Sequence, residues 1–194
     1  MTKIIFATQN AGKLKEIKQI LSDYEVLSMK EAKIDIDIEE TGKIFEENAK
    51  IKAEELTKYT DYIVLADDSG LEVDYLNKEP GIYSARYLGE NTPQVEKNQS
   101  ILDRLGDVPT GERTARFVCA IAIAKVGHVT KVVRGTMEGY IGKTSEGTHG
   151  FGYDPIFCLQ NGTPIATLER EQKNAISHRG QALQLIKKEI KNYI

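Results

Sequence analysis

Apolar and polar positions alternate with two different periods along the first half of the chain. Short apolar runs at residues 3–7 (KIIFA), 24–29 and 62–66 are typical of strands buried in a sheet. Between them, apolar residues recur at helical spacing over residues 14–21. They recur again over residues 44–59, where the stripe consists of Phe45, Ala49, Ala53 and Leu56. Strands that alternate with helices predict an α/β fold.

The second half of the chain has a different pattern. Residues 114–126 and 129–141 are long apolar-rich runs on either side of a Gly-His pair, and they predict a hairpin. Helical spacing returns over residues 93–105 and in a charged segment at residues 181–191. Because the strands of a hairpin pair antiparallel, we expect a mixed sheet rather than a purely parallel one.

The stretch ADDSGL at residues 66–71 places two adjacent carboxylates, Asp67 and Asp68, directly after an apolar run. The pattern predicts that the strand ends here in a Ser-Gly turn and that a strand resumes over residues 71–75. One interpretation is a turn in which a carboxylate caps backbone N–H groups. The other is that the two anions hold a cation between them or that one of them takes part in chemistry.

Length and charge limit the possible functions. A chain of 194 residues predicts a single domain, residues 1–194, that is large enough for a core and a cleft. The 26 Lys and Arg against 29 Asp and Glu give a net charge of -3, which argues against a nucleic acid partner. Any phosphate recognition must therefore come from local clusters.

Cysteine use and the absence of long apolar segments indicate a compartment. Cys119 and Cys158 lie in separate apolar runs without metal-ligand spacing, so we expect buried thiols in a reducing environment. The N-terminal residues do not resemble a signal peptide, and no run approaches the roughly 20 apolar residues that span a bilayer. We expect a soluble, cytoplasmic protein with no membrane partner.

A candidate phosphate site lies between the first strand and the first helix. Backbone N–H groups and the dipole at a helix start attract anions, and a lysine adds a positive charge. The stretch TQNAGK has these features, and its residues are Thr8, Gln9, Asn10, Ala11, Gly12 and Lys13. The common nucleotide fingerprints GxxxxGK[ST] and GxGxxG are absent at this position. The alternative interpretation is an ordinary capped helix with an exposed lysine.

A candidate metal site combines two acidic pairs. Mg²⁺ binds oxygen ligands, with one or two carboxylates from the protein and the remainder from water and substrate phosphates. A glutamate from Glu39-Glu40 and an aspartate from Asp67-Asp68 meet this requirement if their loops approach each other. The alternative is that both pairs are solvated.

Two further stretches predict a pocket for a purine base. In GFGYDPIF, Phe151 could stack on a base and Asp154 could accept its hydrogen bonds. In KNAISHRG, the guanidinium of Arg179 can donate to both O6 and N7 of a 6-keto purine, whereas adenine presents an amino group there. The alternatives are aromatics that fill the core and a solvated basic helix face.

These stretches together resemble the inosine triphosphate pyrophosphatase family, which removes non-canonical purine nucleoside triphosphates from the nucleotide pool. The resemblance covers residues 8–183 and rests on six motifs in the family's order. The motifs are TQNAGKLKEI, EETGKIFEENAKIKA, ADDSGLEVDYL, PGIYSARY, GFGYDPIF and KNAISHRGQAL. Two positions depart from the family pattern, because Gln9 replaces a common glycine and Ile44 a common threonine.

The resemblance implies a fold, an activity and roles for individual residues. The fold would be an elongated mixed sheet with flanking helices that form two lobes around a central cleft, in a homodimer. The activity would be Mg²⁺-dependent hydrolysis of ITP, dITP or XTP to the monophosphate and pyrophosphate. Asp68 would be the proton acceptor, and Glu39 and Asp68 the metal ligands, with Glu40 as the alternative to Glu39. Residues 8–13 and Lys52 would contact phosphates, and the remaining substrate contacts would be Ser69, Phe151, Gly152, Tyr153, Asp154, Lys173, His178 and Arg179.

Two other functions fit some of these features. A nucleotide sensor would keep the pocket without turnover, and a structural domain would leave the acidic pairs solvated.

A pyrophosphatase of this kind must also exclude guanine, which shares O6 and N7 with hypoxanthine and xanthine. Its 2-amino group must therefore be penalised in the pocket.

Overall fold

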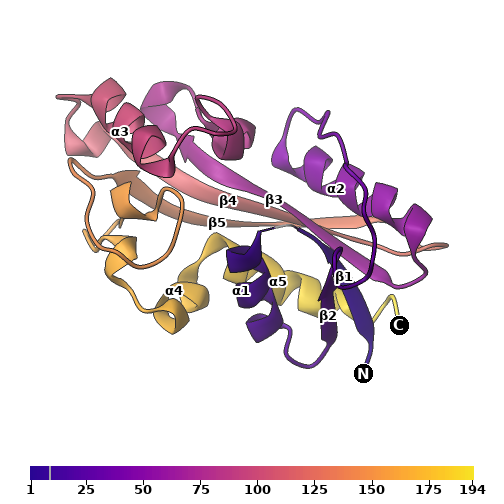
Figure 1. The fold of residues 1–194 in the computed structure, drawn as a ribbon. Helices are drawn as coiled ribbons and strands as arrows, with labels where there is room; N and C mark the ends of the chain where they lie inside the picture. The colour runs from indigo at the N-terminus through magenta and orange to yellow at the C-terminus, as the bar shows by residue number, and fades with distance from the viewer. Residues whose placement is uncertain (9) are drawn as a thin grey trace. The chain divides into compact units, whose positions relative to one another are not determined.

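The structure is a computed structural model that describes residues 1–8 and 10–194. In the described chain, six strands form one sheet in the order β2-β1-β3-β4-β5-β6 (Figure 1). The strands are β1 Lys3–Ala7, β2 Glu25–Ser28, β3 Ile63–Val73, β4 Thr114–Ala124, β5 Lys131–Ile141 and β6 Phe157–Leu159. The helices are α1 Ala11–Ile20, α2 Phe45–Leu56, α3 Gln94–Leu105, α4 Arg170–Ile176 and α5 His178–Ile190. Strand β1 pairs parallel with β2 and β3, and β5 pairs antiparallel with β6, which confirms the predicted mixed sheet.

The chain divides into two compact units that interleave along the sequence. The first unit consists of residues 1–68, 119–135 and 178–194, and the second of residues 69–118 and 136–177. Strands β3, β4 and β5 each contribute residues to both units. Each unit has its own apolar core.

In the first unit, side-chain alternation along the strands separates two buried faces. Side chains of one parity pack against α1 and α5, and this core includes Ile4, Phe6, Ile17, Leu21, Ile63, Leu65, Leu183 and Ile186. Strand residues of the opposite parity are also buried, as are the α2 residues Ala49 and Ala53. Figure 1 shows α2 on the opposite side of the sheet from α1 and α5. The strands are apolar at successive positions because helices cover both faces.

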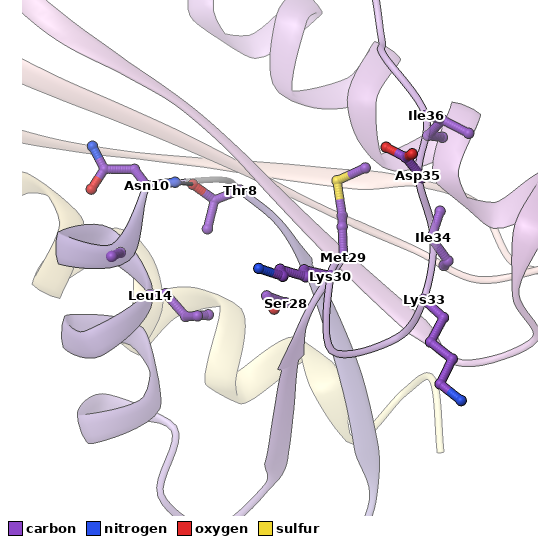
Figure 2. A pocket seen from close by; sticks show the side chains of 11 residues that line it. Thr8, Asn10, Leu14, Ser28, Met29, Lys30, Lys33, Ile34, Asp35 and Ile36 are labelled. Carbon is purple, nitrogen blue, oxygen red and sulfur yellow. Dashed lines mark hydrogen bonds between the residues drawn. The ribbon is translucent and has the colours of Figure 1, made fainter.

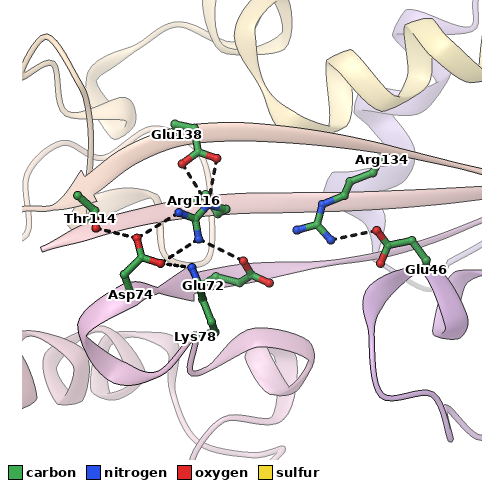
Figure 3. Close-up of polar contacts among 8 residues, drawn as sticks. All are labelled: Glu46, Glu72, Asp74, Lys78, Thr114, Arg116, Arg134 and Glu138. Atoms are coloured by element: carbon green, nitrogen blue, oxygen red, sulfur yellow. Dashed lines mark hydrogen bonds and ion pairs between the residues drawn. The ribbon is translucent and has the colours of Figure 1, made fainter.

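The core of the second unit joins α3 to the far ends of β3, β4 and β5. It includes Leu71, Val73, Ile101, Leu105, Phe117, Met137 and Phe157. The strand positions of the other parity instead carry charges (Figure 3). Arg116 on β4 donates to Asp74 at 3.0 Å and to Glu138 on β5 at 3.0 Å. These ion pairs compensate the charges on one face of the sheet, and the apolar side chains of the other face pack against α3.

The structure corrects the prediction for ADDSGL. Strand β3 runs without interruption through residues 66–71, so Ser69 and Gly70 lie in the strand and do not form a turn. The carboxylate of Asp67 can be buried there because Lys13 binds it at 2.8 Å. The backbone N–H of Leu71 donates to Ser84 Oγ at 2.9 Å, so a side chain replaces a strand partner at that point.

The other predicted elements agree with the structure to within a few residues. Strands β4 and β5 are neighbours in the sheet, as the predicted hairpin requires. Helix α4 and strand β6 were not predicted, although Glu169 and Gln172 form a capping box that marks the start of α4. In the described residues, no helix is both long and apolar enough to cross a bilayer.

Candidate active site

Strand β3 directs the two adjacent aspartates to opposite faces of the sheet. Asp67 has the parity of Ile63 and Leu65, which face α1 and α5, and Asp68 has the opposite parity. The hydrogen-bond partners of the two carboxylates lie on the same two faces, since Lys13 on α1 binds Asp67 and Asn48 on α2 binds Asp68. The two carboxylates therefore face different helices, although the charge of Lys52 acts on both.

Asp67 is an ionised carboxylate compensated by basic side chains. Its side chain is 1% exposed, Lys13 Nζ lies 2.8 Å from Oδ2, and the Arg179 guanidinium lies 4.0 Å away. Burial alone would raise the pKa of Asp67, but the charges of Lys13, Arg179 and Lys52 outweigh this effect and hold the pKa well below its usual range. Asp67 thus fixes the position of Lys13 at the start of α1.

Asp68 behaves in the opposite way. It is 7% exposed, and its Oδ2 accepts a hydrogen bond from Asn48 Nδ2 at 3.0 Å. Burial raises the pKa of Asp68 to about 6, although the charge of Lys52 and the bond from Asn48 act against this rise. The nearby charges of Glu40 and Asp67 contribute to it. A carboxyl group with a pKa near the working pH can accept a proton in one step and release it in the next.

Asn48 connects Asp68 to the segment before α2 that carries Glu39, Glu40 and Gly42, which we call the acidic loop. It is fully buried, and its Oδ1 accepts the backbone N–H of Gly42 at 2.8 Å while its Nδ2 binds Asp68. A Cβ at residue 42 would lie 2.6 Å from Asn48 Oδ1, so this approach requires glycine. Asn48 was not among the predicted site residues. The available signal was an amide adjoining the apolar stripe of a helix, where it needs a buried partner.

The two glutamates of the acidic loop differ in their environments. Glu40 forms an ion pair with Lys52 at 2.7 Å, and the charge of Glu40 raises the pKa of Asp68. Glu39 is exposed. Burial would lower the pKa of Lys52, but Asp67, Asp68 and Glu40 outweigh it and raise the pKa. Lys52 therefore neutralises a group of carboxylates that repel one another.

The oxygen donors near Asp68 fit a hard divalent cation. Asp68 and the acidic loop supply carboxylates only, with no sulfur or imidazole, and this donor set suits Mg²⁺. Among the described residues, no group of three or more His, Cys, Asp or Glu side chains could hold a metal by itself. Mg²⁺ needs few protein ligands when substrate phosphates and water complete its shell, so the donor set fits a metal that binds with substrate.

The candidate phosphate loop forms the start of α1. Asn10 caps the helix, because its Oδ1 accepts the N–H of Lys13 at 3.1 Å, and the first turn has no acidic residue. The positive end of the helix dipole thus remains available to an anion. A cavity of about 580 Å³ opens beside it, between Thr8, Asn10 and Leu14 on one side and residues 28–36 on the other (Figure 2). Gln9 lies outside the described residues.

The candidate base loop, residues 150–157, is held by a buried ion pair in the second unit. Lys173 Nζ lies 2.5 Å from Asp154 Oδ2, and the same oxygen accepts the N–H of Phe151 at 2.9 Å. The ammonium group lies 4.8 Å from the centroid of the Phe151 ring. Asp154 therefore orders the backbone beneath Phe151, in addition to any contact with a base. The interpretation of a solvated basic face is wrong for Lys173, which is 6% exposed.

His178 and Arg179 begin helix α5 in the first unit. Helix α4 ends before Ser177 and α5 begins after it, so both residues lie at a helix start. Both side chains are buried, and Arg179 donates to Glu16 Oε2 at 2.6 Å. The sequence analysis missed Glu16, whose carboxylate orients the guanidinium. The predicted contacts of His178, Arg179 and Ser69 with substrate stay predictions.

The family model for the Ham1 family matches residues 4–189, and the chain belongs to this family. The match covers nearly the whole chain, including every motif on which the sequence resemblance rests. It confirms the family assignment made from the sequence.

Relatives and solved structures agree with this assignment over their full lengths. The chain is 47% identical to the dITP/XTP pyrophosphatase of Exiguobacterium sibiricum, over 99% of this chain and 98% of that protein. It is also 47% identical to the dITP/XTP pyrophosphatase of Clostridium perfringens, over 100% of both chains. The structure of the Staphylococcus aureus Ham1 protein superposes with a TM-score of 0.89 at 43% identity and covers 100% of both chains.

Proposed function

We propose that the chain hydrolyses non-canonical purine nucleoside triphosphates (ITP, dITP and XTP) to the monophosphate and pyrophosphate. The main support is the environment of Asp68, a buried carboxyl group with a raised pKa. Asn48 holds this group next to the acidic loop. The names of the full-length relatives support the substrate class. Removing these nucleotides from the pool would prevent their incorporation into DNA and RNA, and the whole chain would act as one enzyme domain in the cytoplasm, as a homodimer.

Each group of residues has a role in this reaction. The start of α1 with Lys13, together with Lys52, binds the phosphates. In the second unit, the base contacts are Phe151, Gly152, Tyr153, Asp154 and Lys173. Ser69, His178 and Arg179 are the other proposed substrate contacts. Asp68 accepts the proton of the attacking water as the α–β phosphoanhydride bond breaks. One water is consumed, and the nucleoside monophosphate and pyrophosphate leave. Binding and positioning account for most of the catalysis, since the protein forms no covalent bond.

Asp68 and Glu39 would hold Mg²⁺, which would neutralise charge on the phosphate oxygens. Glu39 is proposed because the Glu40 carboxylate is already bound by Lys52, whereas Glu39 is exposed. The effect of Glu40 on the pKa of Asp68 makes Glu40 the alternative ligand.

A pyrophosphate-release assay on ITP with and without Mg²⁺ tests the function. We expect release that depends on the metal. Binding of ITP without release would indicate a nucleotide sensor, and absence of both would indicate that the acidic residues have a structural role. ATP provides the specificity control, because a site that donates to O6 leaves its donors unpaired against a 6-amino group.

A further inference from the structure

Helix α3 carries two polar side chains on its buried face. Lys97 is 3% exposed and Asn98 is 5% exposed, on the same helix as the core residues Ile101 and Leu105. A buried polar group is costly unless it is hydrogen-bonded. Both side chains donate hydrogen bonds to backbone carbonyls outside α3. Lys97 Nζ donates to the backbone carbonyl of Ala85 at 2.6 Å.

Asn98 reaches the candidate base loop. Its Nδ2 donates to the backbone carbonyl of Gly152 at 3.1 Å, directly after Phe151. Its Oδ1 accepts a hydrogen bond from Gln94 Nε2 at 2.9 Å, which fixes the orientation of the amide. In the same loop, the hydroxyl of Tyr153 donates to the carbonyl of Ser84 at 2.7 Å. The hydrogen bond from Asn98 to Gly152 therefore connects the loop to the first turns of α3.

The loop is not packed closely against α3 at this point. A cavity of about 280 Å³ lies between Gln94, Val95 and Asn98 on the helix and residues 145–155 on the other side. Phe151 and Gly152 both line it. Since apolar contacts do not fill this space, the loop has room to shift toward the helix if the polar connection is lost.

The same loop is held a second time from another direction. Asp154 binds the N–H of Phe151 at 2.9 Å and Lys173 at 2.5 Å. Asp154 thus fixes the loop on one side of Phe151 and Asn98 fixes the residue that follows it. Both connections hold the backbone that carries the Phe151 ring. With one connection lost, we expect the loop to move within the space next to α3.

We propose that Asn98 is a positioning residue for the loop that carries Phe151, and that this position sets the selectivity of the enzyme among purine bases. The inference rests on the proposed function, in which Phe151 stacks on the base. Asn98 does not touch the substrate and acts through Gly152. Loss of its hydrogen bond would reduce the discrimination between xanthine and guanine, which differ in the group at position 2 of the ring.

The test compares Asn98→Leu with Gln99→Leu on the same helix. Leucine has the same number and branching of side-chain heavy atoms as asparagine but forms no hydrogen bond. Gln99 is exposed and bonds only locally, at 2.7 Å to Asp103, so its variant is the matched control. The measured quantity is kcat/KM for XTP divided by kcat/KM for GTP. This ratio does not depend on the fraction of folded enzyme, so a general loss of stability leaves it unchanged.

We expect the ratio to fall about fivefold in Asn98→Leu and to stay at the wild-type value in Gln99→Leu, since a single neutral hydrogen bond corresponds to roughly two- to twelvefold. Inhibition by pyrophosphate should be unchanged, because the phosphate-binding residues lie in the first unit. An unchanged ratio in Asn98→Leu would overturn the inference. A parallel change in pyrophosphate inhibition would overturn it as well, because it would indicate general distortion.

Gln94→Leu provides a second variant if Asn98→Leu does not fold. It keeps Asn98 but removes the bond that orients its amide, so the ratio should fall by a smaller factor in the same direction. A wild-type ratio in Gln94→Leu would then overturn the inference. Failure of the wild-type chain to release pyrophosphate from XTP would refute the proposed function itself, and this outcome is distinct from an active enzyme whose ratio does not respond.

Discussion

Asn48 on α2 donates to the carboxylate of Asp68 on β3 at 3.0 Å, and this bond ties the acidic loop to the proposed catalytic strand. The other half of the Asn48 amide accepts the N–H of Gly42. One buried side chain therefore sets the distance between Asp68 and the loop that carries Glu39 and Glu40. The arrangement leads to separate predictions for activity and for stability.

Asp68→Asn should nearly abolish pyrophosphate release while leaving the fold intact. Asparagine has the same shape and still accepts the bond from Asn48, but it takes no proton at neutral pH and is a poor metal ligand. We expect turnover to fall at least 100-fold, in line with the loss of a general base. Circular dichroism and the oligomeric state serve as controls for folding. Full turnover in this variant would contradict both roles proposed for Asp68.

The same variant should be more stable than the wild type at neutral pH without divalent metal. The pKa of Asp68 is raised from 3.8 to about 6, so the folded state holds its proton more tightly than the unfolded state. Its contribution to stability is fully present below pH 4 and is lost as pH rises through 6. We expect Asp68→Asn to exceed the wild type by about 1–3 kcal/mol at pH 7 and to match it near pH 4.

Urea denaturation in EDTA at several pH values measures this difference. Groups distant from Asp68 titrate equally in both proteins and cancel in the comparison. A stability difference that is constant between pH 4 and pH 7 would show that burial does not raise the pKa of Asp68. The pair of results, lower activity with higher stability, is expected of a residue that serves function at the expense of the fold.

Glu39→Gln and Glu40→Gln together decide which glutamate binds the metal. Glutamine keeps the size of the side chain and removes its charge. We expect Glu39→Gln to raise the Mg²⁺ concentration needed for half-maximal activity by about tenfold or more. Glu40→Gln should chiefly release Lys52, which it binds at 2.7 Å, and so change KM for the substrate. The reverse pattern would assign the metal to Glu40.

The sequence predicted most of the fold because burial and periodicity are local properties. Strand β1, helix α2 and the strands β4 and β5 follow directly from apolar runs and stripes. The ADDSGL stretch was the main error. Acidic residues and Ser-Gly usually signal a turn, but here Lys13, 54 residues away in the sequence, neutralises Asp67 within a continuous strand. A long-range ion pair of this kind leaves no periodic signal.

The candidate site was predicted in a similar way, through residues whose chemistry is visible in the sequence. Charged and aromatic side chains such as Asp68, Lys173 and Phe151 stand out in their motifs. The supporting residues Asn48, Glu16 and Asn98 do not, because their roles depend on which elements pack together. An amide or carboxylate on the apolar side of a predicted helix was the available signal for all three.

Lys13→Gln should lower both stability and substrate affinity, and a double variant separates the two effects. The substitution removes the ammonium group bound to the Asp67 carboxylate, which is 1% exposed, and leaves Arg179 at 4.0 Å and the charge of Lys52 to compensate it. We expect a loss of about 2–3 kcal/mol in the free energy of unfolding, below the range for a fully isolated buried charge because Arg179 and Lys52 remain.

Adding Asp67→Asn to Lys13→Gln removes the carboxylate charge that Lys13 had compensated and should restore most of that stability. It should not restore KM, because the ammonium group proposed to bind the triphosphate is still absent. Urea denaturation and steady-state kinetics on the wild type, both single variants and the double variant complete the cycle. Recovery of KM together with stability would mean that Lys13 serves only to neutralise Asp67. In that case the phosphates would depend on the start of α1 and on Lys52 instead.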